Sequence, residues 1–219
     1  MRPRKPPPPP EPIGAWPFSR LYPILDSAYA VSWPSAQAIQ ALARGGCRVV
    51  QLRAKKLTSR EFHDWALEAV QAAKELGISV LVNDRADIAA LVGAAGLHIG
   101  QDDLSPPSAR RLMGPSALIG FSTHSFNQAE AAGALPVDYI AVGPVFATKT
   151  KESAYPPLGP EGVARVRKVV HKPLVAIGGI TLDNAPSVIQ AGADSVAVIS
   201  GLLETNDLET RAREFLVSL

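Results

Sequence analysis

The chain has 219 residues, of which 47% are hydrophobic and 19% charged, a composition typical of a globular protein that can bury a substantial core. Its 22 basic and 20 acidic residues give a net charge of +2, and Arg2, Arg4 and Lys5 against Glu11 already account for that excess. The remaining chain is formally neutral, which argues against a nucleic-acid partner.

No apolar run approaches the roughly 18 residues of a membrane span, and residues 1–12 lack the apolar centre of a secretory signal. We therefore expect a soluble, cytoplasmic protein without a membrane partner. The single Cys47 has no disulfide partner within the chain, and in GGCRVVQLR it is interpreted as a small buried hydrophobe and not as a nucleophile.

The stretch MRPRKPPPPPEP contains five consecutive prolines and predicts an extended or disordered tail over residues 1–15. A proline-reading partner is one interpretation of this tail, and a functionally silent extension is the preferred one. Residues 16–219 are predicted to form a single catalytic domain.

From Leu21 onward, short apolar runs alternate with longer segments of helical period. The expected strands are residues 21–26, 47–53, 79–84, 96–100, 117–123, 139–145, 173–179 and 195–201. The expected helices are residues 35–46, 59–77, 86–95, 106–114, 126–135, 159–170, 183–193 and 207–219.

The expected strands are apolar on both faces, which is typical of a parallel sheet covered by helices, and strict alternation implies right-handed crossovers. Eight strand–helix units in about 200 residues favour an α/β fold of the (β/α)8 TIM barrel type. A doubly wound open sheet is the weaker alternative.

Active sites of such barrels form at the C-terminal ends of the strands. Polar and glycine residues gather at these ends in six of the eight units and in the loop GPVFATKTKES after the sixth strand. They are Gln51, Arg53, Lys55, Lys56, Asn83, Asp84, Arg85, His98, Gln101, Asp102, Asp103, Ser122, Thr123, His124, Ser125, Thr148, Lys149, Thr150, Lys151, Gly178, Gly179, Thr181, Ser200 and Gly201.

Gln51 and Arg53 alternate around Leu52, so both are expected to project into the barrel end while Leu52 packs outward. Together with Lys55 they offer donors of three geometries within five residues, which favours an anion site over a structural ion pair at Arg53.

Asp84 and Asp103 end consecutive units and form a hard-oxygen pair suited to Mg2+. The alternative is that each caps the helix that follows it.

Gly178 and Gly179, with Ser200 and Gly201 in the next unit, predict a phosphate site of the kind common late in this architecture, although turns also use paired glycines. His124 is either an acid or base or a residue that positions its neighbours. His98 is interpreted as a satisfied interior residue, and His63 and His171 as surface residues.

The segments QLRAK, NDRADIA, GLHIGQDDL, GFSTHS, GPVFATKTK, IGGIT and VISG, in this order, resemble the thiamine phosphate synthase family from about Leu21 to the end of the chain. The resemblance implies a Mg2+-dependent transferase on a (β/α)8 barrel. Such a transferase would join hydroxymethylpyrimidine diphosphate to hydroxyethylthiazole phosphate, or its carboxylate, by a dissociative substitution that releases pyrophosphate.

The resemblance also implies roles for individual residues. Arg53, Lys55, Ser122 and Lys151 would be catalytic, and Asp84 and Asp103 would bind the metal. Substrate would be bound by Gln51, Arg53, Lys55, Asn83, Ser122, Thr148, Thr150, Lys151, Gly178, Gly179, Ile199 and Ser200.

Two other functions stay open. One is a thiazole tautomerase of the same barrel family, which His124 favours. The intact GQDD and TKTK segments argue against it, because a tautomerase handles neither diphosphate nor Mg2+. The other is a catalytically idle, phosphate-binding regulatory barrel, which the complete polar rim disfavours. The sequence leaves assembly into a homo-oligomer open.

Overall fold

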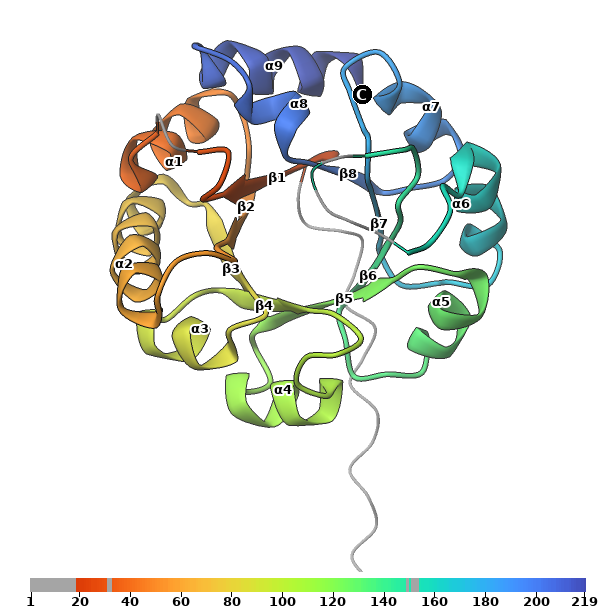
Figure 1. Cartoon of the computed structure of the whole chain (residues 1–219), viewed down its shortest axis with the longest axis horizontal. Helices are drawn as coiled ribbons and strands as arrows, with labels where there is room; N and C mark the ends of the chain where they lie inside the picture. The colour runs from red at the N-terminus through yellow and green to blue at the C-terminus, as the bar shows by residue number, and fades with distance from the viewer. Residues whose placement is uncertain (1–18, 31–32, 149, 151–153) are drawn as a thin grey trace, which may run out of the picture.

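Eight parallel strands close into a barrel that is surrounded by helices (Figure 1). The computed structural model describes residues 19–30, 33–148, 150 and 154–219. The predicted tail over residues 1–15 lies outside the described residues, as do Lys149 and Lys151. The predicted (β/α)8 barrel is confirmed, and the open sheet is excluded because β8 pairs with β1.

Each strand pairs with the next in chain order. The strands are β1 (Leu21–Asp26), β2 (Val49–Arg53), β3 (Ser79–Asn83), β4 (Gly96–Ile99), β5 (Leu118–Thr123), β6 (Tyr139–Val142), β7 (Leu174–Ile177) and β8 (Ser195–Val198). The helices are α1 (Ser35–Arg44), α2 (Ser59–Leu76), α3 (Ala86–Val92), α4 (Pro106–Met113), α5 (Phe126–Ala132), α6 (Gly159–Arg167), α7 (Ala185–Gln190), α8 (Ser200–Leu203) and α9 (Leu208–Ser218).

Alternation along the strands separates two apolar cores. In β1, Leu21 and Leu25 belong to the large core between barrel and helices, while Tyr22 and Ile24 belong to the core inside the barrel. The two-residue period of a strand sends neighbouring side chains to opposite faces. Apolar strand residues are therefore buried on both sides, which explains the near-continuous apolar runs in the sequence.

Helix α2 shows how local sequence sets the outer layer. Thr58 caps its first turn in a capping box with Glu61, and Gly77 ends it in the left-handed conformation. Residues at three- and four-residue steps from Phe62 to Ala73 are buried against the sheet. No helix in the described ranges is long and apolar enough to cross a bilayer.

The N-terminal end of the strands is closed by charged side chains that are bound to backbone. Arg110 pairs with Asp138 at 2.6 Å, and Asp138 also accepts the Ile119 N–H. Asp194 accepts the Leu174 N–H and pairs with Arg167. These charged groups are paired with one another and with the backbone. Ligands are therefore expected at the opposite end, where the strands have their C-termini.

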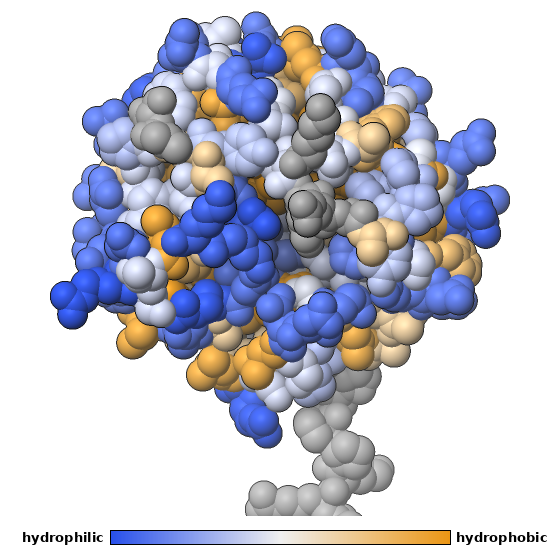
Figure 2. Space-filling view, in the orientation of Figure 1, coloured by the Kyte–Doolittle hydropathy of each residue, from blue (hydrophilic) through white to orange (hydrophobic). Residues whose placement is uncertain are grey.

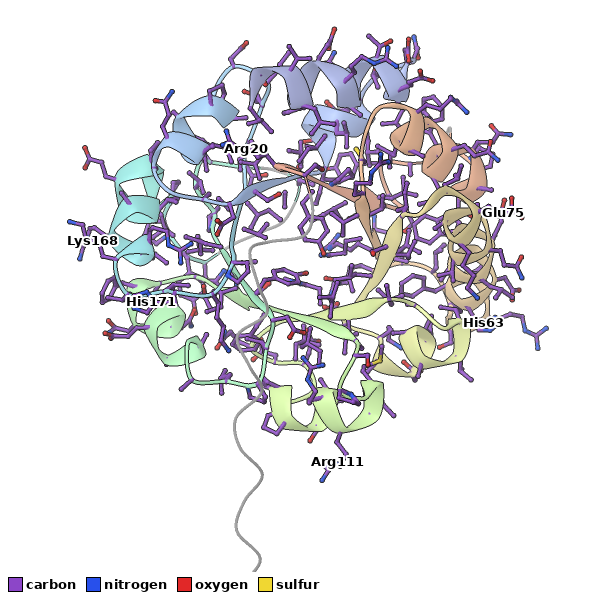
Figure 3. The ribbon with its side chains drawn as sticks, turned by 180° about the vertical axis from the view of Figure 1, so that it is seen from behind. Arg20, His63, Glu75, Arg111, Lys168 and His171 are labelled. Atoms are coloured by element: carbon purple, nitrogen blue, oxygen red, sulfur yellow. The ribbon has the colours of Figure 1, made fainter. Side chains whose placement is uncertain are left out.

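The outer surface is mainly polar. Figure 2 shows hydrophilic residues predominating on one face, with apolar side chains scattered among them. Figure 3 shows His63 and His171 at the outside of the molecule, in agreement with their interpretation as surface residues.

Candidate active site

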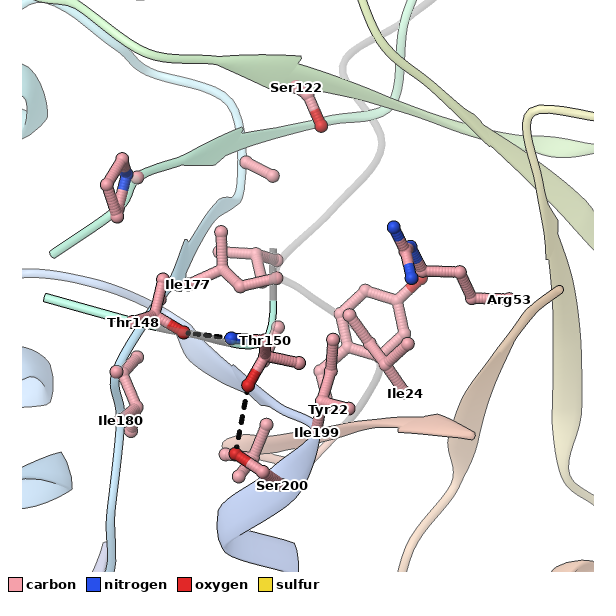
Figure 4. A pocket seen from close by; sticks show the side chains of 18 of the residues that line it. Tyr22, Ile24, Arg53, Ser122, Thr148, Thr150, Ile177, Ile180, Ile199 and Ser200 are labelled. Carbon is pink, nitrogen blue, oxygen red and sulfur yellow. Dashed lines mark hydrogen bonds between the residues drawn. The ribbon is translucent and has the colours of Figure 1, made fainter. Parts of the chain in front are cut away.

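A cavity of about 600 Å³ lies at the C-terminal ends of the strands. All eight strands contribute to its lining, β3 through Asn83 and β4 through His98, and so do the loops that follow β5, β6, β7 and β8. Figure 4 shows Arg53 and Ser122 on different walls, with Thr150 and Ser200 at another. The cavity brings together most of the site residues predicted from the sequence: Gln51, Arg53, Asn83, Ser122, Thr148, Thr150, Gly178, Gly179, Ile199 and Ser200.

Arg53 is held by a carboxylate that the sequence analysis missed. Register places Asp26 of β1 beside Arg53 of β2, and Asp26 is only 1% exposed. One carboxylate oxygen of Asp26 accepts a hydrogen bond from Nη1 of Arg53, and the other accepts the Ala28 N–H at 2.9 Å. A buried charge needs such a partner, so Asp26 fixes the guanidinium at the cavity wall.

Lys55 lies just outside the main cavity. A second cavity, of about 420 Å³, shares Arg53 and Thr150 with the first and is also lined by Lys55 and Lys56. Lys55 forms an ion pair with Asp84. Three cationic side chains therefore gather at the end of β2, next to the carboxylates.

Asp84 has a backbone conformation that is uncommon for its residue type. Its φ of +62° is the single positive value of a non-glycine residue in the described part of the chain. Its N–H donates to the His98 carbonyl at 2.8 Å, which ties the end of β3 to β4. Strained backbone of this kind is frequent at functional sites.

Asp103 faces Asp84 in an electrostatically unfavourable arrangement. Burial raises the pKa of the Asp103 carboxyl, and the neighbouring Asp84 raises it further; the Gly100 N–H and Lys55 act in the opposite direction. The N–H of Gly100 donates to Asp103 at 2.7 Å. Two adjacent carboxylates of this kind suit a divalent cation that also keeps water and substrate oxygens as ligands.

The alternative that these aspartates cap helices is wrong. The residue before α3 is Arg85 and the residue before α4 is Ser105, and neither helix start has a side-chain cap. Asp103 instead accepts its hydrogen bond within the turn after β4. No group of three or more His, Cys, Asp or Glu side chains that could hold a metal ion occurs among the described residues.

Gly178 and Gly179 are required by close packing as well as by backbone conformation. Both have positive φ, at +103° and +64°. A Cβ on Gly178 would lie 2.6 Å from Cα of Pro144, and one on Gly179 would lie 2.5 Å from the Ala147 carbonyl oxygen. The loop after β7 therefore packs directly on the loop after β6 and fixes its position over the cavity.

Short hydroxyl side chains link the loop after β6 to β8. The Thr150 N–H donates to Oγ1 of Thr148 at 3.2 Å, and Oγ1 of Thr150 lies 3.1 Å from Oγ of Ser200 (Figure 4). The predicted hydroxyl cluster is thus brought together across 50 positions of sequence. Lys151, predicted to act beside it, lies outside the described residues.

A chain of buried hydrogen bonds runs across the inside of the barrel. Nε2 of Gln51 donates to Oη of Tyr22 at 3.1 Å, and Oη of Tyr22 lies 2.7 Å from Oη of Tyr139. Nδ1 of His98 lies 2.8 Å from Oη of Tyr139, and its Nε2 lies 2.8 Å from Oγ of Ser122. The interpretation of His98 as a satisfied interior residue is confirmed. The sequence analysis missed both tyrosines, because an aromatic residue in a strand is usually core.

His124 has a positioning role in this geometry. Its Nδ1 donates to the Gly143 carbonyl at 2.8 Å, and its ring stacks on Tyr155 with centroids 4.8 Å apart. Both contacts attach the end of β5 to the loop after β6. Cys47 is fully buried, and burial raises the pKa of its thiol to about 12, as expected for a residue that is not a nucleophile.

Comparisons with known proteins agree on one family. The model of a family described as thiamine monophosphate synthase matches residues 21–202. A thiamine-phosphate synthase of Koribacter versatilis is 46% identical over 201 residues, which cover 90% of this chain and 94% of that protein. Another, of Albidiferax ferrireducens, is 43% identical over 188 residues, 86% of each chain. The solved structure of a thiamine phosphate pyrophosphorylase from Pyrococcus furiosus has a TM-score of 0.81 and 31% identity, and the match covers 91% of this chain and 94% of that one.

Proposed function

The chain belongs to the thiamine monophosphate synthase family, and we propose that its barrel mouth joins a hydroxymethylpyrimidine diphosphate to a hydroxyethylthiazole phosphate, with release of pyrophosphate. It is a transferase that makes thiamine phosphate. The observation that carries the assignment of the site is the single cavity that holds Arg53, Ser122, Thr150 and Gly179 from four different strand–loop units.

We assign the diphosphate to the end of β2. Arg53 presents a planar fork that is held by Asp26, and Lys55 adds a mobile point charge. Gln51 and Asn83 line the same wall, and Lys151 completes the set in this proposal. Breaking the bond between the pyrimidine methylene and the diphosphate concentrates negative charge on the departing group, so cations fixed here stabilise the transition state.

Asp84 and Asp103 are the residues that would hold Mg2+. The support is the raised pKa of Asp103 beside Asp84, since a cation between the two carboxylates would relieve their repulsion. The chemistry that such an ion supplies is neutralisation of charge on the diphosphate oxygens. Lys55, paired with Asp84, lies where it can contact both the carboxylates and the diphosphate.

We assign the thiazole phosphate to the side of the cavity formed by the loops after β6, β7 and β8. Thr148, Thr150 and Ser200 offer hydroxyls there, and the backbone at Gly178 and Gly179 has no side chain to obstruct an anion. The apolar side chains Ile177, Ile180 and Ile199 also line the cavity (Figure 4). They exclude water from the centre of the cavity, where a pyrimidine methylene cation would otherwise be hydrolysed.

The proposed substitution needs no protein nucleophile. Once the methylene–oxygen bond of the diphosphate breaks, the thiazole nitrogen forms the new carbon–nitrogen bond with its lone pair, and pyrophosphate leaves with the electrons of the broken bond. Cys47 is buried in the outer core, away from the cavity lining, so the chain presents no competing thiol there. The walls hold and orient both substrates, which lowers the entropic cost of bringing the reacting atoms together.

The test is formation of thiamine phosphate and pyrophosphate by the purified chain with both substrates and Mg2+. Arg53→Ala should lower turnover at least about 100-fold. Arg44→Ala, in an exposed ion pair with Glu209, is the matched control and should be neutral. A folded wild-type chain that makes no thiamine phosphate contradicts the proposal.

The relatives reported above are named as the synthase, so the comparisons give the tautomerase and the idle barrel no support. Tautomer conversion of a thiazole phosphate without Mg2+ would favour the first of these. The cytoplasmic location stays a prediction, and assembly into a homo-oligomer stays open.

A further inference from the structure

The buried hydrogen bonds between Gln51 and Ser122 connect two predicted substrate-binding residues that lie on non-adjacent strands. The path passes through Tyr22, Tyr139 and His98, each of which comes from a different strand. None of these three side chains is more than 6% exposed. The geometry of the network is therefore fixed before a substrate binds.

The chemistry of the Gln51 end determines a direction. The amide nitrogen of Gln51 can only donate, so Oη of Tyr22 accepts this bond and has its own proton available for Oη of Tyr139. Burial raises the pKa of Tyr22 to about 12 and that of Tyr139 well above 10, so each phenol keeps its one proton at any working pH. Both hydroxyls can thus accept one bond and donate the next.

The same direction continues to the far end. The proton of Tyr139 is directed at Nδ1 of His98, which accepts it as a neutral imidazole, and the ring proton then resides on Nε2. Nε2 donates to Oγ of Ser122, whose own hydroxyl proton remains for the cavity. At the near end, one N–H of Gln51 is engaged with Tyr22, which fixes the orientation of the amide and leaves its carbonyl oxygen as the acceptor for a ligand.

We propose that Tyr22, Tyr139 and His98 are positioning residues that keep all the hydrogen bonds of this network pointing in one direction. Ser122 then meets the substrate as a hydrogen-bond donor and Gln51 as an acceptor. This inference deepens the proposed function and rests on it for the identity of the substrate. Reversal of the chain would turn Ser122 into an acceptor, which would repel the anionic group of a phosphorylated substrate.

The experiment reads the His98 tautomer directly in the full chain without ligand. A protein labelled with ¹⁵N-histidine gives a long-range ¹H–¹⁵N spectrum in which protonated and unprotonated ring nitrogens differ. The His98 signals are identified by their loss in His98→Gln. His124 is an internal reference, since its Nδ1 donates to a carbonyl and must carry a proton. We expect His98 to carry its proton on Nε2; a proton on Nδ1 overturns the proposal.

A substitution at the Gln51 end of the hydrogen-bond chain tests the direction. In Gln51→Glu the charged carboxylate can only accept, so Tyr22 must donate to it and every bond reverses, which moves the His98 proton from Nε2 to Nδ1. The spectra run from pH 7 to pH 10, because burial raises the pKa of a carboxyl by several units. Gln51→Met, similar in length and without a donor or acceptor, is the matched control: it removes the group that sets the direction and should not by itself move the His98 proton fully to Nδ1. An unchanged tautomer in folded Gln51→Glu over the whole range overturns the proposal.

Kinetics separate this role from a purely structural one. Ser122→Ala should lower kcat about tenfold in the wild-type background, the equivalent of one hydrogen bond. In the His98→Gln background, Ser122→Ala should lower kcat by less than about twofold. Thermal unfolding confirms that the background variant is folded. Equal effects in both backgrounds would contradict the coupling. Because the tautomer is read without substrate, a failed spectrum and a failed synthase assay are distinguishable.

Discussion

Asp26 and Arg53 form an ion pair between β1 and β2 in which the carboxylate is almost completely buried and the guanidinium faces the cavity. The strand register alone places the two residues side by side. The pair shows that the site depends on residues that touch no substrate, because Asp26 sets where the cation of Arg53 lies.

Asp26→Asn should therefore affect stability and turnover together. The change leaves the Arg53 charge half-buried without its partner, a loss of about 3 kcal/mol in the free energy of unfolding. We expect turnover to fall as Arg53 becomes mobile. The measurements are chemical unfolding and synthase kinetics.

Asp87→Asn is the matched control for this change. It breaks the ion pair of Asp87 with Arg85, in which both side chains are exposed. The free energy of unfolding should fall by less than about 1 kcal/mol, and turnover should be unchanged. Equal costs for the two variants would show that burial of the Asp26 carboxylate has no energetic consequence.

Asp103→Asn should stabilise the metal-free protein while it removes activity. The pKa of Asp103 is raised in the folded state by burial and by Asp84, so the folded protein binds this proton more tightly than the unfolded chain. Stability from this group therefore decreases as pH rises through the range just above its ordinary value of 3.8. The neutral amide removes this decrease, so we expect a higher Tm at neutral pH.

Titration with Mg2+ provides the second measurement on Asp103. The wild-type Tm should rise with Mg2+ and a pyrophosphate ligand, and that of Asp103→Asn should not. Turnover should fall at least about 100-fold. A Mg2+-dependent Tm shift that survives the substitution would move the metal site elsewhere.

Gly179→Ala should damage the site more than a change at another glycine of nearly equal φ. At Gly179 an added Cβ would lie 2.5 Å from the Ala147 carbonyl oxygen and 2.8 Å from Cβ of Phe146, whereas at Gly93 it would meet nothing within 4 Å. Their φ values are +64° and +65°. We expect Gly93→Ala to cost about 1 kcal/mol of stability with normal kinetics.

Gly179→Ala should cost more than this control, because the loop after β6 must move, and it should raise KM for the thiazole phosphate. Thermal unfolding and steady-state kinetics check both effects. Indistinguishable behaviour of the two variants would mean that packing between the two loops is unimportant.

Ser200→Ala should raise KM for the thiazole phosphate about tenfold and leave KM for the pyrimidine diphosphate unchanged. The physical reason is that Ser200 and Thr150 present paired hydroxyls where the loop after β6 meets the start of α8. Ser187→Ala, on the exposed face of α7, is the control and should leave both constants unchanged. An increase in KM for the diphosphate instead would reverse the assignment of the two walls.

Much of the site could be predicted because its residues follow strands directly. Gln51, Arg53 and Ser122 occupy the last positions of β2 and β5, so the period of a strand and the closure of the barrel suffice to direct them to one mouth. Lys55 and Asp84 lie one or two residues further on, where the turn decides direction. The sequence analysis placed both residues at the rim, but the ion pair between them was not predicted.

Other residues gave no signal. Asp26 ends the run LYPILD like any polar residue after a strand, and Tyr22 and Tyr139 have the pattern of core aromatics. Their roles depend on contacts between different strands, made by residues separated by 27 and 117 positions. A hydrophobic pattern reports which face a side chain is on and not which polar atom it meets there.

The sequence by itself determined the alternation of strands and helices, the barrel, and the set of polar residues at its open end. These follow from local periodicity and from the burial of apolar faces, which short segments encode independently. Only the tertiary structure decided that Asp26 holds Arg53, that Asp84 and Asp103 face each other, and that a buried hydrogen-bond path joins Gln51 to Ser122. The first two depend on the register between neighbouring strands and on the turns that follow them. The third depends on closure of the barrel, because Tyr22 and Tyr139 lie on strands that are not neighbours.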